Sequence, residues 1–309
     1  MVGGLGLHTH ALSVAFDLYS SPYGDWSYLR YFFVLLWYGY NFFVLGDSVV
    51  SFKNYRMGRI DSPTLLKAAP AFSLIPPTVE LKPTPKLNRR FLNPQFKMFH
   101  NDTLGNCTAA ACLNTLIMLT AILKYSLDIP EDLAIQLYTE TADYNPKDPS
   151  TDRGAIETQV LARASQNGIP TKFYRYYPVW GTIDYSNILE MATVVEVFGS
   201  CYLGVILRMG DMDVLDNRGR LDTYPNIDMR IDGGHALIIV DYDGLEPTDT
   251  VYLATWGTLV EATWAWVIAR AMEAHALAFR QLMTSHGRSI TGLTWDDMIE
   301  KNKQFLTRI

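Results

Sequence analysis

One long stretch, residues 107–125, constrains the fold more than any other part of the sequence. It is rich in Ala and Leu and apolar on nearly every face, so a helix formed there must be buried on all sides. Burial of such a helix requires a substantial domain around it. A chain of 309 residues is long enough for one large domain or two modest ones with ample core. The sequence therefore predicts a central helix that begins at Cys107.

Helical patterns dominate the sequence before Gly199, and short strand patterns follow it. The strands are indicated by apolar or alternating runs bounded by turn residues. Helices first and strands second are typical of an α+β fold rather than a parallel α/β sheet. Besides the central helix, helices are predicted over residues 130–141, 154–166 and 185–198. The predicted strands cover residues 201–207, 235–242 and 250–256.

Charge and cysteine content exclude two classes of protein. The formal net charge of −6 gives no basic surface for nucleic acid, so we expect none as a partner. The chain has 3 cysteines, and an odd number argues against a disulfide framework. The composition therefore favours a cytoplasmic protein over a secreted one. It leaves the oligomeric state open.

Residues 1–56 differ in character from the rest and are predicted to form an apolar, aromatic-rich extension. Residues 31–46 carry no charge, but a helix of that length is shorter than the hydrocarbon core of a bilayer. Three interpretations stay open. The extension contains a membrane segment within residues 26–46, it forms a buried or partner-docking helix, or it is a non-native stretch ahead of a translation start at Met57.

Residues 57–98 are predicted to be a linker or a strap across the domain surface. The run 75–86 carries four prolines, which favour extended backbone and exclude a helix. The main domain is then predicted to span residues 99–309.

Two residues in this framework have the chemistry of a nucleophile and its base. Cys107 lies in the first turn of the central helix, where the positive end of the helix dipole stabilises a thiolate. His235 opens an apolar strand about 130 residues later, and its imidazole can accept the thiol proton. We therefore expect the Cys107 sulfur to lie within reach of a His235 ring nitrogen. A lone buried cysteine is more often a small core residue, and Cys112 and Cys201 are interpreted in that way.

The motifs around these residues resemble those of the papain family of cysteine peptidases. Asn101 stands six positions before Cys107, where that family has a glutamine. His235-Ala-Leu is similar to the family's His-Ala-Val at the start of a strand. Ala254-Thr-Trp-Gly is similar to its Asn-Ser-Trp-Gly, with alanine in place of the asparagine.

A divergent papain-like group, often encoded by bacteriophages, is the most similar. It shares an ordered set of motifs with this chain: Asp152-Arg-Gly, Gly233-Gly-His and Thr255-Trp-Gly. This resemblance implies a phage-associated protein as an alternative to a purely cytoplasmic one. It also implies a papain-like fold with a helical half, an antiparallel β half and the active site in the cleft between them.

The resemblance implies a cysteine peptidase that forms an acyl-enzyme on Cys107, with His235 as general base and acid. It assigns the oxyanion hole to Asn101 together with the Cys107 backbone N–H. The implied substrate is a peptide or protein, and neither a cofactor nor a metal is expected. His275, in an alanine-rich stretch interpreted as helical, has no metal-ligand spacing.

The residue that should orient the histidine is the weak point of the pattern, because alanine occupies the usual asparagine position. Asp241 shares a strand with His235 but lies about 20 Å along it, which excludes a contact. Thr255 is the best polar candidate, with Trp256 as a shield against water. Three functions stay open: a peptidase, a cell-wall peptide hydrolase, and a catalytically inactive structural or attachment module of a phage particle.

Overall fold

The computed structural model describes residues 51–62, 81–124, 126–280 and 296. The chain divides into Met1–Val50 and Ser51–Ile309, and all described residues belong to the second unit. The apolar stretch 26–46, and with it most of the predicted extension, therefore lies outside the described residues. Within the described ranges, no helix combines the length and apolar character that crossing a bilayer requires.

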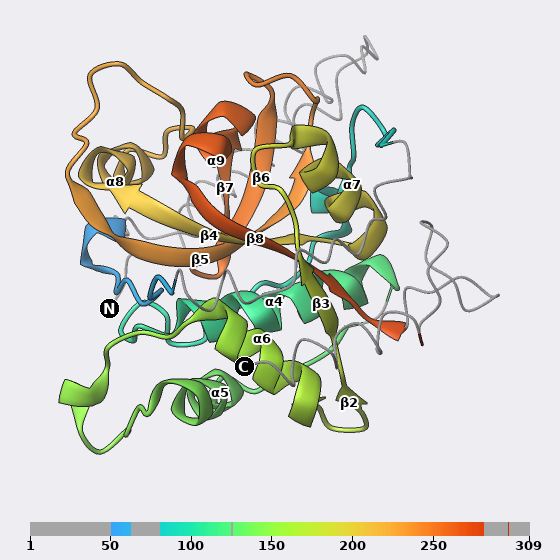
Figure 1. Ribbon diagram of the computed structural model, residues 1–309, viewed down its shortest axis with the longest axis vertical. Helices are drawn as coiled ribbons and strands as arrows, with labels where there is room; N and C mark the ends of the chain where they lie inside the picture. Colours follow the sequence, from blue (N-terminus) through green and yellow to red (C-terminus); the bar gives the residue numbers. More distant parts are fainter. Residues whose placement is uncertain (1–50, 63–80, 125, 281–295, 297–309) are drawn as a thin grey trace, which may run out of the picture. The chain divides into compact units, whose positions relative to one another are not determined.

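The described residues form helices and largely antiparallel sheets (Figure 1). The α-helices are α4 (Cys107–Ile122), α5 (Asp132–Ala142), α6 (Glu157–Asn167), α7 (Ile188–Phe198), α8 (Met209–Asp216) and α9 (Trp264–Arg270). Short 3-10 helices are η1 (Phe52–Asn54), η2 (Arg89–Leu92) and η3 (Pro149–Thr151). The strands are β1 (Ile169–Pro170), β2 (Arg175–Tyr176), β3 (Val179–Thr182), β4 (Cys201–Arg208), β5 (Ile231–Tyr242), β6 (Thr250–Thr255), β7 (Thr258–Thr263) and β8 (Ala271–Ala278).

A six-stranded antiparallel sheet of order β3-β8-β4-β5-β6-β7 separates two hydrophobic cores. Helices α4, α5 and α6 lie on one side and pack against Tyr202 and Ala236 of the sheet (Figure 1). Helices α7, α8 and α9 pack on the other side against Leu203 and Leu237. Neighbouring residues of a strand point to opposite faces, so β4 and β5 supply both cores at once. This arrangement confirms the predicted α+β class.

Helix α4 is the centre of the helical half. It begins at Cys107, as predicted, and every residue from Cys107 to Thr120 is buried. The Tyr202 hydroxyl on β4 donates a hydrogen bond to the Thr108 carbonyl at 2.9 Å. Because both groups are buried, this bond fixes the first turn of α4 against the middle of the sheet.

The interpretation of the stretch around His275 as helical is wrong. Residues Ala271–Ala278 form strand β8, which pairs with β3 on one side and β4 on the other. The alanine content favours a helix locally, but the sheet provides hydrogen-bond partners on both edges of this segment. Tertiary pairing therefore decides its structure.

Residues 81–98 lie against the end of β5. The Tyr242 hydroxyl donates to the Thr84 carbonyl at 2.8 Å, and the Leu87 N–H donates to the Tyr242 carbonyl at 3.0 Å. Arg90 forms an ion pair with the buried Asp241 at 2.9 Å. The partner of Asp241 is thus an arginine of this segment and not His235.

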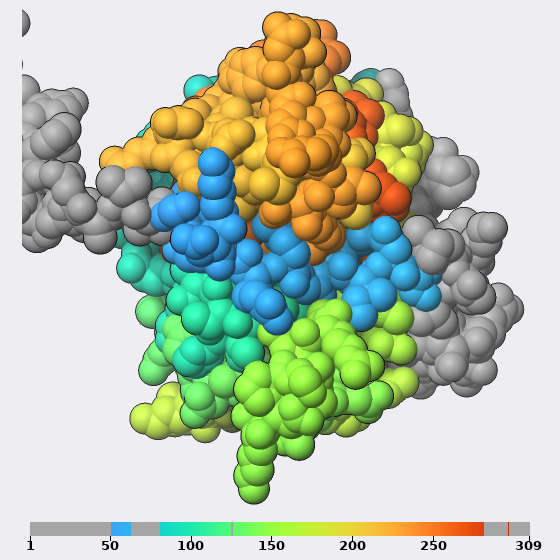
Figure 2. Space-filling model, turned by 90° about the vertical axis from the view of Figure 1, so that its left-hand side faces the viewer, coloured from blue at the N-terminus to red at the C-terminus, as the bar shows by residue number. Residues whose placement is uncertain are grey.

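Residues 51–62 pass between the two halves. Figure 2 shows them as a blue band between the helical half, in green, and the β half, in orange. The backbone N–H groups of Gly58 and Arg59 donate to the Gly234 carbonyl of β5 at 3.2 and 3.0 Å. On the other side, Ile60 N–H donates to the Ala155 carbonyl at 2.9 Å. This segment is therefore bonded to both halves of the domain, directly beside His235.

Candidate active site

The thiol of Cys107 is completely buried at the start of α4. Burial raises the pKa of this thiol to about 12, although hydrogen bonding from the backbone of Ala236 and Gly58 acts in the opposite direction. The helix dipole was expected to favour a thiolate here. In this state the expectation fails. Loss of hydration destabilises the thiolate more than the helix N-terminus and the backbone groups stabilise it.

The loop before Cys107 is held by a network centred on Asp152. One carboxylate oxygen accepts hydrogen bonds from the Gly105 N–H at 3.0 Å and from the Tyr138 hydroxyl at 2.7 Å. The same Tyr138 hydroxyl accepts from the Gly154 N–H at 2.8 Å. The sequence identified Asp152 only as part of a motif. The structure shows that it fixes the turn that leads into α4.

Asn101 is buried in this loop, with 2% of its surface exposed. Its side-chain Nδ2 donates a hydrogen bond to the Leu104 carbonyl at 3.1 Å. An amide nitrogen carries two protons, and this bond uses one of them. The observed bond gives Asn101 a place in the turn before Cys107, and its part in an oxyanion hole stays a prediction.

His235 lies on β5 between a threonine and a tryptophan. Its Nε2 is 2.6 Å from the Thr255 hydroxyl oxygen. The Trp256 indole stacks on the imidazole with ring centroids 4.1 Å apart and an interplanar angle of 21°. Burial lowers the pKa of His235 to about 3. The imidazole is therefore neutral, oriented by Thr255 and shielded on one face.

The other ring nitrogen of His235 is free. Within the described part of the chain, Nδ1 is buried with no hydrogen-bond partner, so no hydrogen bond joins it to Cys107 in this state. The backbone of Ala236, the residue after His235, does act on Cys107, since it favours the charged form of the thiol and lowers its pKa. When Nε2–H donates to Thr255, Nδ1 carries the lone pair that a general base needs.

The segment 51–62 covers this site. The rings of Phe52 and Tyr55 lie 5.5 and 5.6 Å from the Trp256 ring, which stacks in turn on His235. Gly58 lies against the backbone of Gly105, two residues before Cys107, because a Cβ atom on Gly58 would lie 1.9 Å from the Gly105 carbonyl oxygen. Both Cys107 and His235 consequently have no exposed surface.

A buried ionic cluster lies beside the covered site. The Arg59 guanidinium is 3.0 Å from Glu157 at the start of α6 and 2.6 Å from Glu273 on β8. Nε2 of His275 lies 3.1 Å from the second Glu273 oxygen. Donor atoms of Glu157, Glu273 and His275 lie within 4.8 Å of one another, a spacing that a metal ion could use. The Arg59 guanidinium forms ion pairs with the same two carboxylates, so the cation observed at this place is Arg59.

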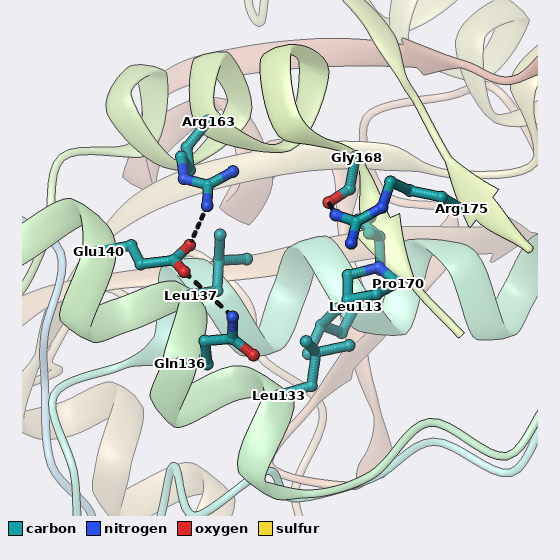
Figure 3. Close-up of a pocket in the computed structure, with 10 residues that line it drawn as sticks. Leu113, Leu133, Gln136, Leu137, Glu140, Arg163, Gly168, Pro170 and Arg175 are labelled. Atoms are coloured by element: carbon teal, nitrogen blue, oxygen red, sulfur yellow. Dashed lines mark hydrogen bonds and ion pairs between the residues drawn. The ribbon is translucent and has the colours of Figure 1, made fainter. Parts of the chain in front are cut away.

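A separate surface pocket lies in the helical half (Figure 3). Arg163 on α6 and Glu140 on α5 form an ion pair across it at 2.5 Å, and Gln136 donates to Glu140 at 3.0 Å. Its lining contains none of the four predicted site residues.

Comparison with solved structures finds a cysteine protease of the same architecture. Xylellain from Xylella fastidiosa matches with a TM-score of 0.54 at 14% identity, over 73% of this chain and 96% of that chain. The fold is papain-like. At this identity the papain-like match establishes the fold alone, and the roles of individual residues rest on the geometry above.

Two further papain-like structures match more weakly. ProCathepsin B S9 from Trypanosoma congolense matches with a TM-score of 0.48 at 10% identity, over 76% of this chain and 89% of that chain. Digestive procathepsin L 3 of Tenebrio molitor matches with a TM-score of 0.48 at 11% identity, over 74% and 77%. At these TM-scores neither match adds to the argument.

The sequence itself has no match among protein-family models or curated proteins. Nothing in the structural matches points to the phage-associated group that the motifs resemble. That finer resemblance is therefore unsupported.

The low pKa of His235 predicts a specific pH dependence of stability. An unfolded histidine titrates near 6.5, whereas folded His235 titrates near 3. Between these values the unfolded chain binds a proton that the folded chain does not, so the free energy of unfolding falls as the pH falls from about 6.5 towards 3. We expect this term to reach up to about 5 kcal/mol.

Urea denaturation at several pH values tests this prediction. His235→Gln keeps a polar side chain next to Thr255 but does not titrate, so its stability should depend less steeply on pH than that of the natural chain. Carboxylates titrate in both proteins, and their contribution cancels in the comparison. Identical pH slopes for the two proteins would contradict a buried, neutral His235.

Proposed function

We propose that the chain is a thiol-dependent peptidase with Cys107 as nucleophile and His235 as general base and acid. The observation that supports this proposal best is the 2.6 Å contact between Thr255 and Nε2 of His235, which leaves Nδ1 unpartnered. This contact supplies the imidazole orientation that the missing asparagine would otherwise give. It supports an assembled catalytic pair more than a histidine that serves only packing.

The proposed reaction proceeds through an acyl-enzyme. His235 accepts the Cys107 proton, and the thiolate attacks the peptide carbonyl carbon. The oxyanion is stabilised by the Cys107 N–H and the second Asn101 amide proton. Collapse of this intermediate breaks the C–N bond, and the amine leaves with the proton from His235. Water, deprotonated by His235, then cleaves the thioester and restores the thiol.

The described state is a resting state of this enzyme. With the pKa of Cys107 near 12 and that of His235 near 3, the proton stays on sulfur at neutral pH. Both shifts have burial as their main cause. Entry of water or substrate in place of residues 57–61 would bring the two pKa values together and allow the first proton transfer.

A second candidate function is a non-catalytic papain-like module. The observation that favours it is the complete burial of Cys107 and His235 under the chain's own residues. In such a module the covered state would be permanent. A cell-wall peptide hydrolase would use the same residues, and its substrates belong in the same assay.

Hydrolysis of peptides, including cross-linked cell-wall peptides, tests the assignment of the nucleophile. We expect Cys107→Ala to lower turnover at least about 10³-fold, because no other group can form the acyl-enzyme. Cys112→Ala is the matched control, since it removes a buried thiol from the same helix. Hydrolysis that survives in the Cys107 variant at the natural rate would refute the proposal.

Substitution of Thr255 tests the origin of the imidazole orientation. Thr255→Val keeps the shape and removes the hydroxyl, and we expect kcat to fall about 10²-fold. That loss is smaller than the ~10⁴-fold effect of an orienting carboxylate, because the hydroxyl carries no charge. Thr255→Ser retains the oxygen and should stay within a few-fold of the natural kcat. Equal kcat values for the valine and serine variants would remove Thr255 from the machinery.

A further inference from the structure

Residues 57–61 lie between the halves in the manner of a bound peptide. The Ala155 N–H donates to the Gly58 carbonyl at 2.7 Å, and Ile60 N–H donates back to the Ala155 carbonyl at 2.9 Å. On the opposite side, Gly58 and Arg59 both donate to the Gly234 carbonyl. An extended chain held through its main chain on two sides is a common mode of peptide recognition, in which side-chain pockets supply the specificity.

Glycines from both halves make room for this backbone. A Cβ atom on Gly154 would lie 2.3 Å from the Gly58 carbonyl oxygen, and one on Gly234 would lie 2.5 Å from the Arg59 carbonyl oxygen. A Cβ on Gly58 would lie 1.9 Å from the Gly105 carbonyl oxygen. The passage beside Cys107 thus has the width of a bare main chain at Gly58, and the next side chain must turn out of it.

The Arg59 side chain turns into a pocket between α6, β4 and β8. Its Nε lies 3.0 Å from Glu157 and 3.1 Å from Glu273, and its Nη2 lies 2.6 Å from Glu273. Gly204 on β4 leaves the space for it, since a Cβ there would lie 2.3 Å from both the Arg59 Nε and a Glu157 oxygen. A third carboxylate, that of the exposed Asp61, pairs with the remaining guanidinium nitrogen.

The two carboxyl groups of this pocket favour a cationic partner. Burial and the neighbouring Glu273 raise the pKa of Glu157, whereas Arg59 acts against that rise. Burial would raise the pKa of Glu273 too, but His275 and Arg59 hold it below its usual value. A guanidinium offers planar donors that match several carboxylate oxygens at once, and it is charged at any physiological pH. Without the guanidinium, the two buried carboxyl groups would lose their charged donor and keep His275 as a neighbour.

We propose that the Glu157–Glu273 pocket is a specificity site for an arginine side chain of the substrate, and that Arg59 occupies it in the resting chain. That this arginine belongs to a substrate rests on the proposed peptidase function. The binding of a guanidinium in the pocket does not depend on it. Gly58 lies against Gly105, two residues before Cys107, so the pocket takes the side chain of the residue adjacent to the one at the nucleophile. A substrate with arginine at that place displaces residues 57–61 through the same contacts.

Binding is tested in the full chain with Arg59→Ala, which empties the pocket. The probes are n-butylguanidine and its uncharged isostere n-butylurea, each followed by thermal unfolding. We expect n-butylguanidine to raise the Tm of the variant by about 3–6 °C at about ten times its Kd, and n-butylurea to leave it unchanged. The natural chain should show no such rise, because Arg59 fills its pocket. Equal responses to the two probes would overturn the proposal.

Three additional substitutions keep this test decisive. Arg59→Gln retains a polar side chain and serves where Arg59→Ala does not fold; if neither folds, recovery on refolding with n-butylguanidine but not with n-butylurea gives the same answer. Adding Glu273→Gln to the empty-pocket variant should abolish the response. Adding Glu261→Gln, at an exposed position of β7, should preserve it. A response that survives the Glu273 substitution would place the probe elsewhere.

Substrate preference is tested by hydrolysis with Arg59→Gln. Arginine and leucine are placed in turn at each of the two positions on either side of the scissile bond. The kcat/KM values of the two peptides are then compared for each position. We expect arginine to be preferred about tenfold or more at one position, and Glu273→Gln to abolish that ratio. Hydrolysis without this preference, together with no guanidinium response, would refute the pocket while leaving the peptidase intact. A guanidinium response with no hydrolysis would support the pocket and refute the peptidase.

Discussion

One guanidinium connects the three parts of the molecule on which the site depends. Arg59 comes from the segment ahead of the main domain, Glu157 from the first residue of α6, and Glu273 from β8. Charged side chains are almost never fully buried without partners, so the burial of each of these three side chains depends on the other two. Together with the backbone bonds of Gly58 and Arg59 to Gly234 and Ala155, this contact holds residues 57–61 over the candidate site.

Burial explains the shifted pKa values of Cys107 and His235. The thiol of Cys107 stands at a helix N-terminus, which favours a thiolate, yet burial raises its pKa to about 12. His235 has its pKa lowered to about 3 by the same cause. Thr255 and Trp256 thus orient His235, while Cys107 and His235 are both neutral at physiological pH. In the proposed peptidase, activation requires a change in solvation and not a change of residues.

Much of this fold could be predicted from local patterns. The apolar run after Cys107 predicts a buried helix, and α4 is buried along nearly its whole length. The apolar run after His235 predicts a strand, which β5 forms with an added start at Ile231. Thr255 was predicted as the polar neighbour of His235, and the contact is present at 2.6 Å. These features depend on residues close in sequence or on a single hairpin.

The Arg59 cluster could not be predicted in the same way, because its members are distant in sequence and belong to elements that were interpreted differently. Residues 57–61 were assigned to a linker, and the segment around His275 to a helix. Helix α6 was predicted from residue 154, but residues 154–156 precede it and Ala155 bonds to Gly58 and Ile60 instead. One signal was available: Glu273 and His275 interrupt an otherwise apolar run, and polar groups in such a run indicate buried partners.

The rate of Cys107 alkylation by iodoacetamide as a function of pH tests the covered site most directly. Modified peptides identify which cysteine reacts, with buried Cys112 and Cys201 as internal controls. The account predicts slow reaction of the natural chain at neutral pH, and a reaction at least about tenfold faster in Arg59→Gln, because release of residues 57–61 exposes the thiol and lowers its pKa. Rapid alkylation of Cys107 in the natural chain at pH 7, with no change in the variant, would contradict it.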